Sequence, residues 1–359
     1  MRERPLRGEA LTAPLTPSRA GLLVAIAALA LALGCQPAQS QAAAEREGER
    51  RQKDSVGDLN ADPGNPAGGG AVDDSAEAAA VGAPAGASIR SGPLAKVESA
   101  LYPWMEGAEG AELTTLEASF APPKGFSRIS AAEGGFGRWL RGLPVRTDRH
   151  NVLAWDGSPL SSPSAAVIFL DVGQRDLQQC ADTAIRLRAE FLWASGRAEE
   201  VAFHFTSGDR SAWRAWQRGE RFKIAGNKVA RAQGAARKND HAELRRYLDN
   251  VFRYAGTQSL WRDSDPVPVG ADILPGDFFV QPGGPGHAVV VLDVAAHPDG
   301  RRAALIGQGF MPAQELHVVR SDGPEAIDGV WFILPVAAAD TLDTPSWRPF
   351  ARTEVRRFK

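Results

Sequence analysis

The chain has only two cysteines among its 359 residues, and it has no excess of charge of either sign. Two thiols exclude a scaffold of several disulfides and any zinc or iron–sulfur centre that needs four thiolates. Lysine and arginine total 41, against 43 aspartate and glutamate residues. A net charge of -2 lacks the basic excess that neutralises phosphates, so we expect no nucleic-acid partner.

The sequence motifs of several enzyme classes are also missing. The chain carries no GxSxG nucleophile elbow, no P-loop and no dinucleotide-binding glycine fingerprint. His287, Asp293 and His297 are spread along one expected strand and its turn, a spacing that does not direct them at one metal ion. Carboxylates are plentiful, but nothing pairs two of them for glycoside hydrolysis. We therefore expect neither a metal nor an organic cofactor.

Long hydrophobic runs are rare, and the clearest one lies near the N-terminus. Arg2, Arg4, Arg7 and Arg19 precede an uncharged run over residues 20–34, which is too short to span a bilayer comfortably and is typical of a signal-peptide core. The following string LALGC resembles a bacterial lipobox, in which the cysteine becomes lipid-modified. The sequence predicts a lipoprotein signal peptide over residues 1–34 and a lipid-anchored Cys35. A signal peptide without a lipid and a short membrane anchor remain the alternatives.

Residues 35–95 have the composition of a disordered tether. They are rich in Ala, Gly, Glu, Asp and Pro, and Leu59 is the only Leu, Ile, Phe, Tyr or Trp between positions 36 and 88. Such a segment buries too little apolar surface to offset the entropy of ordering it. Gln36, rather than Asp, follows the cysteine, and the lipobox resemblance then implies sorting to the periplasmic face of the outer membrane. We expect a single folded domain over residues 96–359.

Hydrophobic periodicity predicts an α+β domain. An apolar stripe at intervals of three and four residues predicts a helix over residues 176–194, with Asp176 and Gln179 at capping-box spacing and Cys180 in the first turn. A second helix is expected over residues 240–254. Runs and alternation of apolar residues predict strands over residues 165–170, 201–205, 278–280, 287–294 and 303–308.

The last two expected strands suggest a site. A hairpin turn centred between His297 and Pro298 places His287 opposite Gln308, and directly opposed residues share a face of the ladder. The amide oxygen of Gln308 is then able to accept the ring N–H of His287. Together with Cys180 at a helix N-terminus, these residues form the constellation of papain-like cysteine hydrolases. In such a site the helix N-terminus and an imidazolium lower the pKa of the thiol, which attacks an acyl carbon.

Five strings, in order, resemble the bacterial family of domain of unknown function 4846 across nearly all of the expected folded region. They are DLQQCADTAIRLRAEFL, FHFTSGD, YLDNVFRYAGTQSL, PGDFFVQPGGPGHAVVVLDVA and LIGQGFMPAQELHV. The family label carries no established reaction, so this resemblance implies architecture and an envelope location. The order Gly276-Asp277, then Gly286-His287 before an apolar strand, is similar to NlpC-type and other papain-like cell-wall peptidases.

The papain-like resemblance implies a core of antiparallel sheet packed on a helix that carries the nucleophile. It also implies Cys180 as the nucleophile, His287 as the base and Gln308 as the residue that orients it. Gln174, six residues before Cys180, matches the spacing of an oxyanion-hole glutamine. The context QQCAD departs from the Asp-Cys-Ser string that is usual in NlpC-type enzymes.

Each candidate also has a structural interpretation. Cys180 lies on an apolar stripe, where a free cysteine is often a buried core residue. His287 and Gln308 suit a turn and a strand edge, and Asp277 suits a brace for the turn after Gly276. We therefore expect one of two functions: a thiol hydrolase acting on amide bonds of the cell envelope, such as peptidoglycan peptides, or a non-catalytic binding or scaffolding lipoprotein.

Overall fold

The computed structural model describes residues 96–106, 111–225 and 228–359. The expected signal peptide 1–34, Cys35 and the expected tether 35–95 lie outside the described residues. Within the three described ranges, no helix has both the length and the hydropathy that crossing a bilayer requires.

The described part of the chain is a mixed α/β structure built on an antiparallel sheet of ten strands. The main path of the sheet runs β11-β20-β12-β13-β14-β15-β6, with β2 paired to β13, β17 to β14 and β16 to β17. The strands of this sheet are β2 (Ser127–Arg128), β6 (Ser164–Val167), β11 (Ser264–Pro266), β12 (Phe278–Gln281), β13 (His287–Ala296), β14 (Arg302–Gln308), β15 (His317–Val319), β16 (Ala326–Ile327), β17 (Trp331–Ile333) and β20 (Val355–Phe358).

The remaining strands form five antiparallel pairs around this sheet. They are β1 (Leu113–Thr115) with β3 (Pro144–Arg146), β4 (Val152–Leu153) with β5 (Pro159–Leu160), β7 (Ala202–His204) with β8 (Arg210–Ala212), β9 (Glu220–Ala225) with β10 (Lys228–Gln233), and β18 (Thr341–Thr344) with β19 (Trp347–Ala351).

The helices are short, apart from α5 and α7. The α-helices are α3 (Leu116–Ser119), α4 (Phe136–Arg141), α5 (Cys180–Ala194), α6 (Trp213–Gln217), α7 (His241–Phe252) and α8 (Thr257–Arg262). The 3-10 turns are η1 (Ser99–Leu101), η2 (Pro103–Met105), η3 (Ala198–Glu200) and η4 (Arg352–Glu354).

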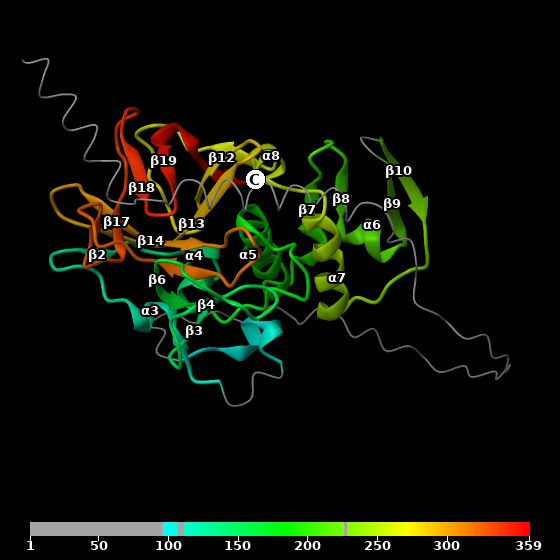
Figure 1. Ribbon diagram of the computed structural model, residues 1–359, viewed down its shortest axis with the longest axis horizontal. Helices are drawn as coiled ribbons and strands as arrows, with labels where there is room; N and C mark the ends of the chain where they lie inside the picture. Colours follow the sequence, from blue (N-terminus) through cyan, green and yellow to red (C-terminus); the bar gives the residue numbers. More distant parts are fainter. Residues whose placement is uncertain (1–95, 107–110, 226–227) are drawn as a thin grey trace, which may run out of the picture. The chain divides into compact units, whose positions relative to one another are not determined.

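Strand β13 lies in the middle of the sheet and is buried on both faces, as its nearly continuous apolar sequence predicts. Ala288 and Val290 pack into a core shared with α5, α7 and α8. Val289 and Val291 face the opposite side, in a second core shared with the β18–β19 hairpin. Because side chains alternate along a strand, successive apolar residues from Ala288 to Leu292 pack into these two cores in turn. Figure 1 shows α5 beside the sheet strand β13, which it contacts.

The β13–β14 hairpin was expected, but its register differs from the expected one. Val290 pairs with Gly307 and Val291 with Ile306, a shift of two residues. The turn closes with a hydrogen bond from the His297 N–H to the Arg301 carbonyl oxygen, so it is longer than a two-residue turn, and a bulge follows Val291. A shift of two keeps the side chains before the bulge on their expected face, whereas between the bulge and the turn the shift is three residues, as in the pair of Val294 with Ala304.

Candidate functional site

Cys180 is the first residue of α5, rather than a residue within a helix that starts at Asp176. Gln179 is the N-cap, and its backbone N–H donates a hydrogen bond of 3.2 Å to Oδ2 of Asp182. The expected cap at Asp176 is therefore wrong by three positions, because Asp182 supplies the acceptor of the capping box. The Asp176 carboxylate instead accepts the backbone N–H of Ala313 at 2.7 Å and so ties the loop after β14 to the start of α5.

The Cys180 thiol is buried, with 6% of the residue exposed. Burial raises the pKa of this thiol to about 11, and the nearby Asp182 adds to the rise. Backbone N–H groups of Ala288, Ala181 and Cys180 itself point at the sulfur and oppose the rise, but burial outweighs them. The thiol is therefore protonated at neutral pH in this structure. The contact with the Ala288 amide places the sulfur one residue along β13 from His287.

His287 and Gln308 form the contact that the hairpin predicts, despite the shift in register. Nε2 of His287 lies 3.1 Å from Oε1 of Gln308, and both side chains are buried. The other end of the Gln308 amide, Nε2, lies 3.4 Å from Nε2 of His317, the first residue of β15. Nδ1 of His317 lies 3.1 Å from the carbonyl oxygen of Glu315. A continuous polar chain thus runs from the Glu315 backbone to His287, across three neighbouring strands.

The donors and acceptors along this series of hydrogen bonds assign the tautomers of His317 and His287. A carbonyl oxygen only accepts, so Nδ1 of His317 carries the proton and Nε2 of that ring accepts from the Gln308 amide. The oxygen of Gln308 then faces His287, whose Nε2 carries the proton and donates. Nδ1 of His287 is left as an unprotonated nitrogen, and it is buried without a hydrogen-bond partner among the described residues. Such a nitrogen keeps a lone pair that is able to accept a proton.

Both histidines are neutral at neutral pH. Burial lowers the pKa of His287 to about 4, against a smaller opposing effect of the Gln308 hydrogen bond. Burial likewise lowers the pKa of His317 to about 4, with the Glu315 carbonyl and carboxylate acting in the opposite direction. Because desolvation disfavours the charged imidazolium, the covered site holds no thiolate–imidazolium pair.

Aromatic rings cover His287 from the β18–β19 side. The ring centroid of His287 lies 4.9 Å from that of Trp347, 4.8 Å from that of Phe310 and 6.0 Å from that of Phe350. The Gln281 amide holds this cover in place. Its oxygen accepts from Nε1 of Trp347 at 2.8 Å, and its nitrogen donates to the Pro349 carbonyl oxygen at 2.8 Å.

The structure brings some of the expected site residues together and leaves others apart. His287 and Gln308 are in contact, and Cys180 contacts the amide next to His287. The thiol and the imidazole are not hydrogen-bonded to each other: α5 packs on one face of β13, whereas the His287 ring lies on the other face, under Trp347. Gln174 is exposed on the segment before α5, and its side chain hydrogen-bonds none of these residues.

Two residues of the site were missed by sequence reasoning. His317 and Trp347 lie 30 and 60 positions beyond His287 along the chain, outside the β13–β14 hairpin. His317 stands directly before the apolar pair Val318-Val319, and a polar residue at the start of an apolar strand was the only sequence signal for it. Nothing in the local pattern of Trp347 distinguishes it from other aromatics.

Two further candidates have structural roles. The Asp277 carboxylate accepts the Leu274 N–H at 2.8 Å and pairs with Arg357, so it braces the turn after Gly276, as expected. The Asp293 carboxylate is fully buried and is held by Arg128 at 2.6 Å and Arg141 at 2.7 Å. Its charge is thus already paired with two guanidinium groups.

The chain was compared with known proteins. Residues 116–357, more than half of the chain, match the sequence model of a family described as a domain of unknown function (4846). No curated protein and no solved structure matches the chain. The matched range contains α5, the β13–β14 hairpin and the β18–β19 hairpin, so the whole candidate site lies within it. The chain therefore belongs to the family of domain of unknown function 4846.

Proposed function

We propose that this protein is a papain-like thiol hydrolase that cleaves amide bonds of the cell envelope, with Cys180 as the nucleophile. The observation that carries the proposal is the unpartnered Nδ1 of His287. The polar chain through Gln308 and His317 holds that ring in the tautomer of a base, and a helix N-terminus presents the sulfur next to the following backbone amide. If Gln308 only filled space in the core, its amide would not have to hold His287 with the proton on Nε2 and the lone pair on Nδ1.

The proposed reaction assigns one step to each residue. Nδ1 of His287 takes the thiol proton of Cys180, and the thiolate attacks the amide carbonyl carbon. The imidazolium returns the proton to the leaving amine as the C–N bond breaks, which leaves a thioester on the sulfur. Water, activated by the same ring, then hydrolyses the thioester. During these proton transfers the amide oxygen of Gln308 accepts a hydrogen bond from the Nε2–H of His287 and so orients the ring.

This reaction requires the cover to open. In the described contacts the thiol and the imidazole are buried and on different faces of β13, and burial disfavours both charged forms. Moving the β18–β19 hairpin admits water to His287, which lifts the desolvation penalty on the imidazolium. It also removes the ring that packs on His287, which leaves room for the imidazole to move toward the sulfur at the neighbouring Ala288 amide.

A non-catalytic binding lipoprotein is the second candidate, and the burial of Cys180 favours it. Iodoacetamide labelling across pH separates the two, with mass spectrometry of the tryptic peptide 176–186 so that Cys35 does not contribute. For a hydrolase, Trp347→Ala should label at Cys180 with an apparent pKa below the ordinary value of about 8.5, and the further change His287→Ala should abolish that shift. A thiol that stays unlabelled until denaturant is added, in both variants, supports the binding protein.

We also propose that Cys35 carries a lipid that anchors the domain to the periplasmic face of the outer membrane through the tether 35–95. The charged leader, the short apolar run and the lipobox-like string support this proposal. Mass spectrometry of the mature N-terminus should find diacylglycerol on Cys35. An intact Met1 or an unmodified cysteine would refute the anchor without affecting the proposal for Cys180.

A further inference from the structure

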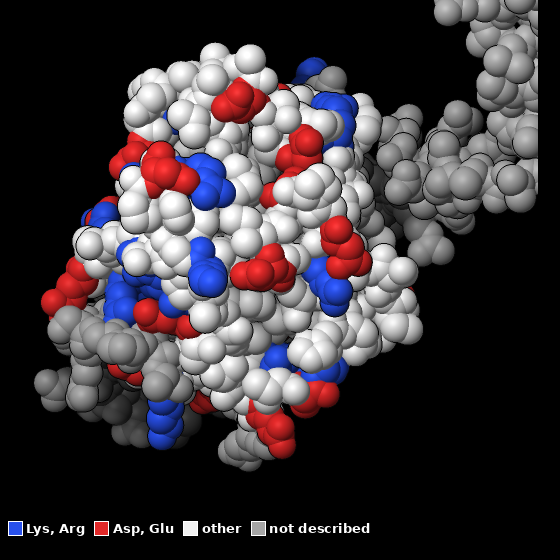
Figure 2. All heavy atoms as spheres, turned by 90° about the vertical axis from the view of Figure 1, so that its left-hand side faces the viewer, with Lys and Arg blue, Asp and Glu red and all other residues white. Residues whose placement is uncertain are grey.

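Positive charge is concentrated in one part of the chain, residues 210–253. This segment, which runs from β8 to the end of α7, holds twelve Lys or Arg and four Asp or Glu, a net charge of +8. The whole chain has a net charge of -2, so the remaining residues sum to -10. By contrast, Figure 2 shows the face at the β2, β17 and β18 end, where basic and acidic side chains are interspersed.

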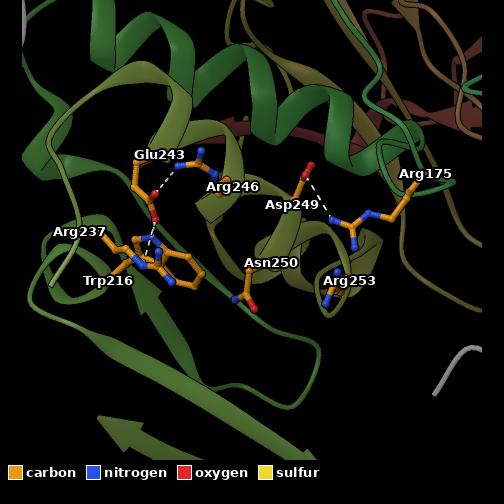
Figure 3. Close-up of a pocket in the computed structure, with 8 residues that line it drawn as sticks. All are labelled: Arg175, Trp216, Arg237, Glu243, Arg246, Asp249, Asn250 and Arg253. Carbon is orange, nitrogen blue, oxygen red and sulfur yellow. Dashed lines mark hydrogen bonds and ion pairs between the residues drawn. The ribbon is translucent and has the colours of Figure 1, made fainter. Parts of the chain in front are cut away.

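A pocket of about 240 Å³ lies in this basic segment, next to α6 and α7. Figure 3 shows the eight side chains that line it, four of which belong to α7. Four arginines and two carboxylates give the lining a net charge of +2. The lining residues are Arg175, Trp216, Arg237, Glu243, Arg246, Asp249, Asn250 and Arg253.

The two carboxylates hold the walls of the pocket in position. Glu243 accepts from Nε1 of Trp216 at 2.7 Å and from Nη1 of Arg246 at 2.7 Å, and it lies 3.7 Å from Arg237. Asp249 accepts from Arg175 at 3.5 Å. Each carboxylate is therefore engaged with the walls, and the guanidinium groups retain N–H donors that these contacts do not use.

Two donors of the pocket have no partner at all within the described ranges of the chain. Nδ2 of Asn250 is buried and makes no hydrogen bond. The exposed side chain of Arg253, one turn of α7 further along, is in no hydrogen bond or ion pair. A buried N–H without an acceptor costs free energy, and a ligand oxygen at this position would remove that cost.

We propose that this pocket binds a phosphate group, presented by a small phosphorylated molecule or by a lipid headgroup. Guanidinium groups reach the pocket from α7 and from two loops, and a tetrahedral oxyanion accepts from several directions, whereas a planar carboxylate is matched by a single guanidinium fork. A phosphate monoester carries close to two negative charges at neutral pH, which equals the net charge of the lining with opposite sign. The volume suits this group with few attached atoms, since drug-sized sites start at about 300 Å³.

Titration of the full-length protein with inorganic phosphate and with glycerol 3-phosphate, followed by calorimetry, tests this site. Asn250→Asp replaces the unpaired donor by a charged acceptor of the same shape, and Arg253→Gln removes a cation that supports no other contact. Each should weaken binding at least about tenfold. Arg214→Gln is the matched control, because Arg214 is an exposed cation of the same segment outside the pocket. It should leave the affinity within twofold.

The remaining arms separate the source of the phosphate and the role of Cys180. Binding to vesicles that contain phosphatidic acid, with no binding of glycerol 3-phosphate, identifies a lipid headgroup, and the reverse identifies a soluble phosphate ester. Cys180→Ser should bind phosphate as the wild type does, since the pocket does not include the thiol. Equal affinity of Asn250→Asp, Arg253→Gln and Arg214→Gln, equal affinity for acetate and phosphate, or no binding of any of these probes would overturn the proposal.

Discussion

Replacing His317 by glutamine should change how the stability of the domain depends on pH. Burial lowers the pKa of His317 from its ordinary value of 6.5 to about 4. Between these values the unfolded chain binds a proton that the folded domain excludes, so stability falls as pH falls from 6.5 to 4. Each pKa unit corresponds to about 1.4 kcal/mol, so His317 alone removes about 3 kcal/mol of the free energy of unfolding between pH 7 and pH 4. Glutamine does not titrate, so His317→Gln should not lose this part of its free energy of unfolding as the pH falls.

Urea unfolding of the wild type and of His317→Gln at intervals from pH 7 to pH 4 measures this difference. At pH 7 the variant should be less stable, by about 1–3 kcal/mol, because a flexible chain replaces the buried ring whose Nε2 accepts from Gln308. The gap should close as the pH falls, by about 3 kcal/mol in total. His150→Gln, at an exposed position, controls for the loss of a histidine as such. A gap that is the same at pH 7 and pH 4 would refute the assignment of His317 as a buried neutral ring.

Three other substitutions test the contacts that surround the site. Trp347→Ala removes the ring that packs on His287 and so exposes the imidazole to water. NMR titration should find the pKa of His287 raised from about 4 toward 6.5, and an unchanged pKa contradicts the role of the cover. Gly276→Ala places a Cβ 2.5 Å from the Phe136 ring at a φ of +95°. Urea unfolding should find the free energy of unfolding lower by about 1–3 kcal/mol, and an unchanged value would show that the turn is not strained. Asp293→Asn leaves the buried Arg141 and the part-buried Arg128 without their carboxylate, so we expect a loss of about 3–5 kcal/mol by the same assay. A loss below about 1 kcal/mol speaks against a buried ion pair.

The sequence predicted those features that depend on local period and on short loops. The helix expected over 240–254 is α7, His241–Phe252, and the alternation along β13 and β14 predicted their pairing and the contact between His287 and Gln308. The register was wrong because a bulge within β13 and a longer turn are set by backbone geometry that the hydrophobic pattern does not encode.

Contacts between residues far apart in the chain could not be predicted from the sequence pattern. His317 reaches Gln308 only because β15 pairs with β14, and Trp347 covers His287 only because a distant hairpin packs on that face of the sheet. The burial of Cys180 likewise depends on tertiary packing, because α5 contacts β13 and the sulfur lies at the Ala288 amide. A helix N-terminus can be recognised from its residues, but the tertiary packing that buries its first side chain cannot.

The four hydrogen bonds of Gln281 have a consequence for how the cover moves. Its oxygen accepts from Trp347 and Arg348, and its nitrogen donates to the Pro349 carbonyl and to Glu354, so the amide has no free donor or acceptor. Sliding the hairpin by a fraction of its length would break several of these bonds and form none. We therefore expect the β18–β19 hairpin to release as a unit, because the bonds to Gln281 break together. One buried amide would then control whether solvent reaches the histidine.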